Sequence, residues 1–195
     1  MYTMTPFPPR RPWALTQPLV TLLRPAQPQA GFTLLEAVVV VTIIAVVAAI
    51  ALPSWLSFLD QRRVNMTQDM IYQALRRTQQ EASQNLQPQQ FSLRERDDLL
   101  EWASHPASVS AVQVAHWTPL IEGVRLASED NTLPSKDGIH YARFDHMGNT
   151  SSLGRITLVG SGGRLSHRCV VVSTLLGAMR KGQGHTRIRD DRYCY

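Results

Sequence analysis

The sequence predicts an α+β protein: a long N-terminal helix, whose first half spans a membrane, followed by a β-rich C-terminal domain. Three observations lead to this fold class. Phe32 to Leu52 is an apolar block with a single charge. From Ser54 to Leu86 no helix breaker occurs, and apolar residues recur at helical spacing. From Ser110 onward, short alternating or apolar runs are separated by clusters of Gly, Pro, Asn and Asp, as in a β-rich domain.

The apolar block has the length and composition of a membrane span. A transmembrane helix needs about 20 consecutive apolar residues. The 21 residues from Phe32 to Leu52 meet that length and are rich in Val, Ile and Ala. The preceding residues carry Arg10, Arg11 and Arg24 and no acid. Because basic flanking segments stay on the cytoplasmic side, we expect a cytoplasmic N-terminus and an extracytoplasmic C-terminal domain.

Three interpretations of this block are open. In the first interpretation the block is a signal peptide cut at the A-x-A pattern Ala49-Ile50-Ala51, which would release a soluble domain. It is a plain single-span anchor, which leaves Glu36 without a role. Or it is an assembly helix in which Glu36 has a partner, since an acid in a membrane span costs about 2.5–3.5 kcal/mol and is a functional hypothesis by default.

The third interpretation requires a cation near Glu36. No Lys or Arg lies near this residue in the sequence. If the chain is cut after Gly31, however, Phe32 gains a free amino group. A neighbouring copy displaced along the helix axis then brings that amine to Glu36, and the pair sets the register in which the apolar helices pack.

The residues at this junction resemble a known motif. Gly31-Phe32-Thr33-Leu34-Leu35-Glu36 is similar to the prepilin cleavage motif of type IV pilins and type II secretion pseudopilins. The resemblance implies that a prepilin peptidase cuts between Gly31 and Phe32 and that Phe32 is N-methylated. It also implies an assembly role for Glu36 and for Pro53, the family's helix proline. The leader of 31 residues is longer than many in the family, is Pro-rich and contains Trp13.

Beyond the span, the pattern predicts that the same helix continues on an amphipathic face. Pro53 removes a backbone donor, so it either kinks the helix near Ala49 or ends the span at the membrane interface. The resemblance, in which such a proline lies within a long continuous helix, implies the kink. Pro88 ends the run. We therefore expect one helix over residues 32–85. The apolar positions of its second half are Leu56, Leu59, Val64, Ile71, Leu75, Thr78 and Ala82.

The rest of the chain is predicted to be mostly strands. The residues from Asp97 to Ala103 are expected to form a short helix. Gly160-Ser161-Gly162-Gly163 is expected to connect a hairpin, and it lacks the ending of a phosphate-binding loop. The expected strands are Val112–Val114, Val124–Leu126, Ile139–Phe144, Ile156–Leu158 and Cys169–Ser173.

The C-terminal strands carry a second resemblance. The motifs Phe144-Asp-His-Met-Gly148, Gly154-Arg-Ile-Thr-Leu158, Arg168-Cys-Val-Val-Val-Ser173 and Leu176-Gly177 are similar, in order and spacing, to the FimT/GspH group of minor pilins and pseudopilins. This resemblance implies a pilin fold, with the long helix packed on antiparallel sheets. The expected domains are a leader over 1–31, an assembly helix over 32–53, its amphipathic continuation over 54–86 and an extracytoplasmic domain over 87–195.

Composition excludes several classes of site. The two cysteines, Cys169 and Cys194, form no CxxC pattern, and the six histidines show no ligand spacing, so we expect no metal site. Neither a nucleophile elbow nor a paired acid–base arrangement is evident, so we expect no enzyme and no cofactor. If the domain is exported, Cys169 and Cys194 form a disulfide; otherwise they are two unrelated thiols.

The net charge of +5 lies partly in a basic C-terminal segment. Its side chains are candidates for contact with phosphates of DNA or with a protein partner, or else form a solvated end. Some FimT-like minor pilins bind DNA through an Arg-rich stretch that begins at Gly-Arg, and here Ala178 follows Gly177. The candidate contact residues are Arg180, Lys181, Arg187, Arg189 and Arg192.

These observations predict a minor pilin or pseudopilin, a structural or priming subunit of a type II secretion pseudopilus or a type IV pilus. Its expected partners are prepilin peptidase, other pilin or pseudopilin subunits and the inner membrane of a bacterium with two membranes. Two alternatives are open: a DNA-binding minor pilin for DNA uptake, and a soluble domain exported after signal peptidase cleavage.

Overall fold

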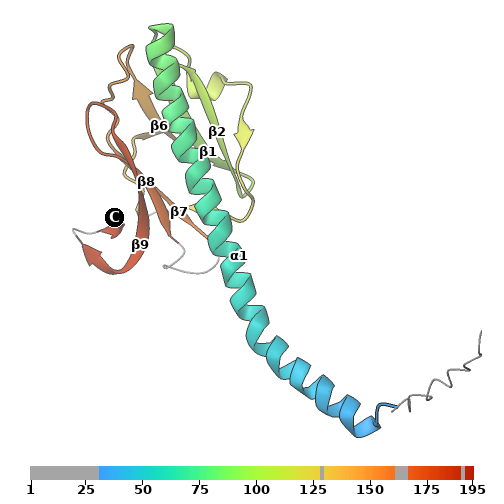
Figure 1. Ribbon diagram of the computed structural model, residues 1–195. Coiled ribbons are helices and arrows are strands. Elements are labelled where there is room, and N and C mark those ends of the chain that lie inside the picture. The colour runs from blue at the N-terminus through green and yellow to red at the C-terminus, as the bar shows by residue number, and fades with distance from the viewer. Residues whose placement is uncertain (1–30, 128–129, 161–166, 190–191) are drawn as a thin grey trace, which may run out of the picture. The chain divides into compact units, whose positions relative to one another are not determined.

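A computed structural model describes residues 31–127, 130–160, 167–189 and 192–195. Within these residues one long helix, α1 (Leu34–Asn85), precedes two five-stranded antiparallel sheets. The chain divides into two compact units between Ile43 and Ile44, within α1. The predicted α+β class, with a long helix and antiparallel sheets, is confirmed (Figure 1).

Helix α1 has clear local reasons for its two ends. Thr33 is its N-cap: the Thr33 hydroxyl accepts a hydrogen bond from the Glu36 amide at 3.2 Å. The helix continues past Pro53, which lacks a backbone donor, so this proline does not end it. At the C-terminus Leu86 adopts a φ of +50°, and the Gln87 amide bonds the carbonyl of Ala82 at 3.2 Å, as in a Schellman motif. The expected helix over residues 32–85 is therefore confirmed to within two residues.

The first sheet has the strand order β3-β2-β1-β6-β5. Its centre is β1, which pairs along its length with β2 and, from Gln89 to Leu93, with β6. Both edge strands are two residues long, which leaves little edge available for pairing with other chains. The strands are β1 (Gln89–Arg96), β2 (Leu99–Pro106), β3 (Thr118–Pro119), β5 (Ser135–Lys136) and β6 (Ile139–Phe144).

The second sheet has the strand order β10-β9-β8-β7-β4. The pairing of β7 with β8 is antiparallel, as expected for a hairpin, although residues 161–163 of the predicted connection lie outside the described residues. The strands are β4 (Arg125–Leu126), β7 (Gly154–Val159), β8 (Arg168–Val172), β9 (Met179–Arg189) and β10 (Arg192–Cys194). Strands expected near residues 124, 139, 156 and 169 are thus present, whereas β1, β2, β3, β5, β9 and β10 were not predicted.

Two local predictions are wrong. Residues Asp97 to Ala103 form no helix: Asp97 and Asp98 both have positive φ, +52° and +62°, and make the two-residue turn that joins β1 to β2. Val112–Val114 is not a strand, because residues Ala111–Gln113 form the 3₁₀ turn η1. Three alternating residues are too few to distinguish a strand from a turn.

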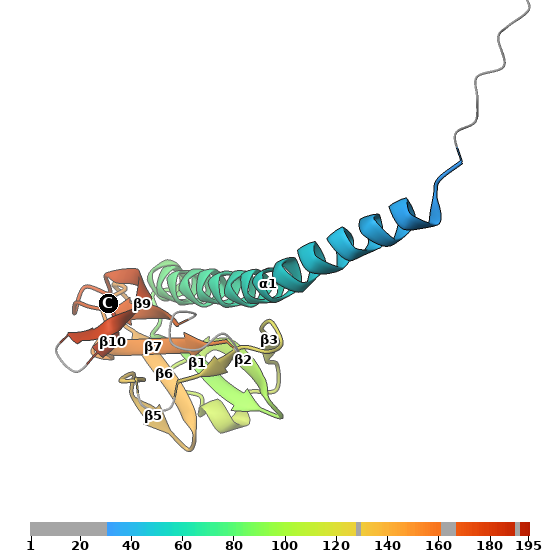
Figure 2. The ribbon, with the colours of Figure 1, turned by 90° about the horizontal axis from the view of Figure 1, so that it is seen from below.

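The core lies between the second half of α1 and the two sheets. Figure 2 shows this part of the helix along one face of the sheets. The helix contributes Val64, Ile71, Leu75 and Ala82, all fully buried, at the spacing of one helical face. The strands contribute Phe91, Leu93, Leu100, Phe144, Ile156, Leu158, Val170 and Val172.

Two glutamines join α1 to the rest of the domain through backbone carbonyls, Gln68 to two strands and Gln79 to two turns. Gln68 is buried, and its side-chain amide donates to the carbonyls of Cys169 and Gly182, on β8 and β9, at 2.7 and 2.8 Å. Gln79, three turns further along the same face, donates to the carbonyl of Gly148 at 2.8 Å and to that of Gly177 at 3.3 Å. A buried amide requires such partners, so these bonds fix where the helix lies on the sheet.

The Gln79 contacts explain two glycines of the C-terminal motifs. Gly148 and Gly177 have φ of +81° and +72°, a region that favours glycine. A Cβ on Gly177 would lie 2.7 Å from the carbonyl oxygen of Gly148 and would also collide with the Gln79 amide. The two turns and the helix therefore meet too closely for any side chain at residue 177.

Asp145 closes the turn that contains Gly148. Its carboxylate accepts hydrogen bonds from the amides of Met147 and Asn149, each at 2.8 Å. Burial raises the pKa of Asp145, but the bonds from Asn149 and Met147 and the nearby His146 together lower it more, so the pKa lies below its ordinary value. The carboxylate is thus ionised and satisfied within its own turn.

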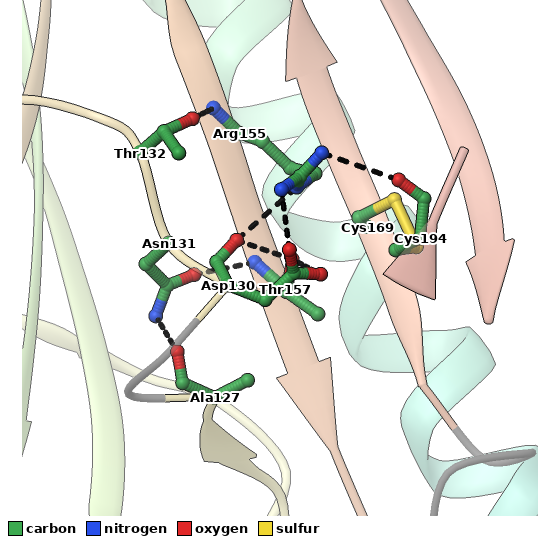
Figure 3. A network of polar contacts seen from close by, with 8 residues as sticks. All are labelled: Ala127, Asp130, Asn131, Thr132, Arg155, Thr157, Cys169 and Cys194. Atoms are coloured by element: carbon green, nitrogen blue, oxygen red, sulfur yellow. Dashed lines mark hydrogen bonds and ion pairs between the residues drawn. A yellow bond between two sulfur atoms is a disulfide. The ribbon is translucent and has the colours of Figure 1, made fainter. Parts of the chain in front are cut away.

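The C-terminus is held by a disulfide and a buried ion pair (Figure 3). Cys169 on β8 and Cys194 on β10 are bonded, which confirms the predicted pair. Beside them Arg155 on β7 forms a buried ion pair with Asp130 and donates to the Cys194 carbonyl at 3.3 Å. Thr157 also donates to the Asp130 carbonyl, at 2.9 Å. No sequence pattern indicated this network, because its partners are far apart in the chain.

We expect Gly177→Ala to destabilise the domain more than Gly138→Ala. Both glycines have positive φ, but a Cβ on Gly138 meets nothing within 4 Å. The control should therefore cost about 1 kcal/mol from backbone strain, and Gly177→Ala about 2–3 kcal/mol. Urea unfolding of the full chain in detergent micelles measures both. Equal losses would show that the contact with Gln79 and Gly148 is unimportant.

We expect Arg155→Met to lower the free energy of unfolding by about 3–5 kcal/mol, because it leaves the Asp130 carboxylate buried without its cation. The double variant Asp130→Leu with Arg155→Met removes both charges and should cost less than the sum of the two single variants. The same urea titrations test this. Additive losses would contradict an energetic coupling between the two side chains.

Candidate assembly site

The first part of α1 exposes an apolar surface that the described chain does not cover. Its large apolar side chains range from 41% exposed at Val40 to 83% at Leu34. Among the described residues α1 is the one helix long and apolar enough to cross a membrane. No residue in the most apolar part of α1 is buried. Apolar surface of this extent is stable only against lipid or against other apolar helices. The segment thus fits a membrane-anchored protein.

Glu36 is the only charged residue within this surface. Its backbone amide is bound by Thr33, but its carboxylate forms no hydrogen bond or ion pair with any described residue. Thr42, the other polar side chain in the middle of the span, donates to the Val38 carbonyl at 2.8 Å and is satisfied. In an apolar environment Glu36 is therefore the one side chain of this segment that needs a partner from outside the helix.

Gly31 and Phe32 lie immediately before the N-cap and outside the helix. Both are exposed, so the bond between them is open to a protease. Glu36 follows Phe32 by about one helical turn. The structure thus brings the predicted cleavage site and the carboxylate to the same end of α1, whereas cleavage, N-methylation and the assembly roles of Glu36 and Pro53 stay predictions.

The basic C-terminal residues do not form one surface among the described side chains. Arg180 and Lys181 are neighbours on β9 and point to opposite faces. Lys181 forms an ion pair with Asp69 of α1 at 2.7 Å and lies over the Tyr72 ring. Arg187 is exposed. The side chains of Arg189 and Arg192 lie outside the described part of the structure, so contact of this segment with DNA stays untested.

No metal centre is formed by the described residues: they contain no group of three His, Cys, Asp or Glu side chains that could hold an ion. One buried Ser–His pair is present, Ser92 with His105, at 2.9 Å. Ser92 is fully buried, so a substrate does not reach its hydroxyl. The hydrogen bond joins the neighbouring strands β1 and β2 within the first sheet and satisfies both side chains.

Comparison with known proteins gives two sequence matches. Residues 27–52 match the prokaryotic N-terminal methylation motif, and residues 68–176 match the type II transport protein GspH family, over more than half of the chain. The comparison with curated protein sequences gives no match.

Solved structures of two kinds are similar to this chain. The type IV minor pilin FimU of Pseudomonas aeruginosa is 11% identical, with a TM-score of 0.45 over 63% of this chain and 90% of that one. The minor pseudopilin EpsH from the type 2 secretion system of Vibrio cholerae is 18% identical, with a TM-score of 0.42 over 61% of this chain and 95% of that one. From the methylation motif, the family match and the fold described above, the chain belongs to the GspH family and is a minor pilin or pseudopilin.

Proposed function

We propose that this chain is made as a precursor, cut between Gly31 and Phe32 by a prepilin peptidase and N-methylated on Phe32. The mature chain then joins a type II secretion pseudopilus or a type IV pilus as a structural or priming subunit. The observation that supports this most directly is the exposed apolar surface of α1 with one unpaired carboxylate, Glu36, about one turn from Phe32.

The proposed pairing follows from the free energy of that carboxylate. Alone in lipid it is costly, and it is stabilised when an ammonium group reaches it. Cleavage creates such a group on Phe32, at least about 6 Å along the axis from Glu36, because Phe32 lies before the helix and four helical residues rise about 6 Å. A neighbouring helix shifted by a similar distance therefore places its terminal nitrogen beside Glu36. Because apolar surfaces pack in many registers, one such ion pair selects a single axial register.

We further propose that the span lies in the inner membrane of a bacterium with two membranes, with its N-terminus in the cytoplasm and the domain in the periplasm. Arg10, Arg11 and Arg24 support this orientation. The disulfide Cys169–Cys194 also supports it, because such bonds persist in oxidising compartments. In this proposal residues 1–31 are the leader, 32–53 the assembly helix, 54–86 its continuation and 87–195 the exported domain.

Mass spectrometry of the mature protein from its host tests the processing step. We expect an N-terminus at Phe32 with one added methyl group, because the Gly31–Phe32 bond is exposed and precedes the helix. An N-terminus at Leu52 would instead identify the A-x-A pattern as a signal peptidase site and the domain as a released soluble protein. An intact leader would contradict both.

We expect Glu36→Leu to reduce recovery of the subunit in sheared or cross-linked filaments by about tenfold or more, because the terminal nitrogen of the next copy loses its partner. Thr42→Val is the matched control: it also removes a polar group from the span, but one already bonded to Val38. Membrane fractionation shows whether each variant is still inserted. Wild-type recovery of an inserted Glu36→Leu variant would refute the pairing.

A further inference from the structure

The guanidinium of Arg143, on β6, is oriented by Gln90 and Tyr141. Its Nε donates to the side-chain oxygen of Gln90 at 2.7 Å, and the group lies over the Tyr141 ring, 5.1 Å from its centre. Arg143 as a residue is exposed. Its two terminal NH₂ groups form no hydrogen bond or ion pair with other described residues. The end of the side chain that binds carboxylates is therefore oriented and available.

A buried chain of hydrogen bonds determines this orientation. The amide of Gln90 donates to the Ser92 hydroxyl at 2.9 Å, and Ser92 lies 2.9 Å from Nε2 of His105. Nδ1 of His105 faces the Pro106 carbonyl at 3.0 Å, which assigns the ring proton to Nδ1 and leaves Nε2 to accept from Ser92. Gln90, Ser92 and His105 are 3%, 0% and 6% exposed. Because unsatisfied polar groups are costly there, the side-chain oxygen of Gln90 must face Arg143.

Arg143 stands between two hollows of the surface, which we call the Arg143 cleft. The first, of about 190 Å³, is lined by Lys136, Asp137, Tyr141 and residues 107–112. The second, of about 360 Å³, is lined by Pro88, Ala107, Phe144, Asp145, residues 149–151 and Leu175. Exposed Val112 gives the first hollow an apolar wall, and exposed Leu175 gives the second hollow one.

Four charged side chains line the cleft, and their formal charges balance: Lys136 and Arg143 against Asp137 and Asp145. Lys136 and Arg143 form no ion pair with a described residue. Of the two acids, Asp145 is occupied by the amides of its own turn, and its pKa is lowered by those bonds. Asp137, exposed at the rim, also forms no ion pair with either cation among the described residues. The feature of the cleft that suits a carboxylate is therefore the oriented guanidinium of Arg143, and not an excess of positive charge.

We propose that the Arg143 cleft binds an acidic peptide segment of a partner protein, with a carboxylate on the terminal NH₂ groups of Arg143. The planar fork of a guanidinium matches a carboxylate with two parallel hydrogen bonds. The apolar walls on both sides receive the neighbouring side chains of an extended peptide. This site is independent of cleavage at Phe32 and of the pairing of Glu36.

Fluorescence anisotropy on the full chain in detergent micelles tests the proposal. The probe is a short fluorescein-labelled peptide of alternating valine and glutamate, compared with the same peptide carrying glutamine in place of glutamate. We expect the glutamate peptide to bind and the glutamine peptide to bind at least about tenfold more weakly. Arg143→Gln should weaken binding of the glutamate peptide by about tenfold to a hundredfold, as loss of charge-assisted hydrogen bonds does.

Arg96→Gln is the matched control, since it removes one exposed arginine. Arg96 lies at the end of β1 opposite to Gln90, the residue that bonds Arg143. It should change the affinity by less than about twofold. Arg143→Lys keeps the charge without the planar fork and should bind more weakly than wild type while preserving the fold. Equal weakening by Arg143→Gln and Arg96→Gln, wild-type affinity of Arg143→Lys, equal binding of both peptides, or no binding by the wild type would each overturn the proposal.

Discussion

The burial of the apolar surface of α1 is the constraint on which the rest of this molecule depends. The first half of the helix exposes Val, Ile and Leu side chains to whatever surrounds it, whereas the second half buries Val64, Ile71 and Leu75 within its own chain. Both parts belong to one helix, Leu34–Asn85, which contains Pro53. The same helix therefore carries the exposed apolar span and, further along, part of the core of the domain.

Polar side chains, rather than apolar ones, give this arrangement its precision. Apolar contact between a helix and a sheet tolerates sliding, but Gln68 and Gln79 must meet particular carbonyls or remain unpaired. The same reasoning applies to Glu36 in the proposed assembly, where a single ion pair selects among many apolar registers. In both cases the hydrophobic effect supplies most of the free energy, and a few directional bonds choose the geometry.

The basic residues of the C-terminal half serve different ends. Arg155 is buried and joins Asp130 to the Cys194 carbonyl, and Lys181 joins β9 to Asp69 of the helix. These two cations are occupied in stabilising the fold. Arg143 differs, because buried Gln90 orients it while its terminal groups stay open. A count of positive charges therefore says little about binding, whereas the partners of each cation show which side chains the fold already occupies.

The sequence by itself determined the elements whose signals are local: the apolar span, the helix through to Asn85, the cleavage motif, the strands with continuous apolar runs and, given export, the disulfide pair. The tertiary structure alone decided the features that join distant residues. β1 and β2 depend on the turn at Asp97 and Asp98, whose positive φ values no periodicity reveals. The Arg155 network and the orientation of Arg143 by Gln90 link residues far apart in the chain. Such contacts depend on strand pairing and packing, which a local pattern of side chains does not specify.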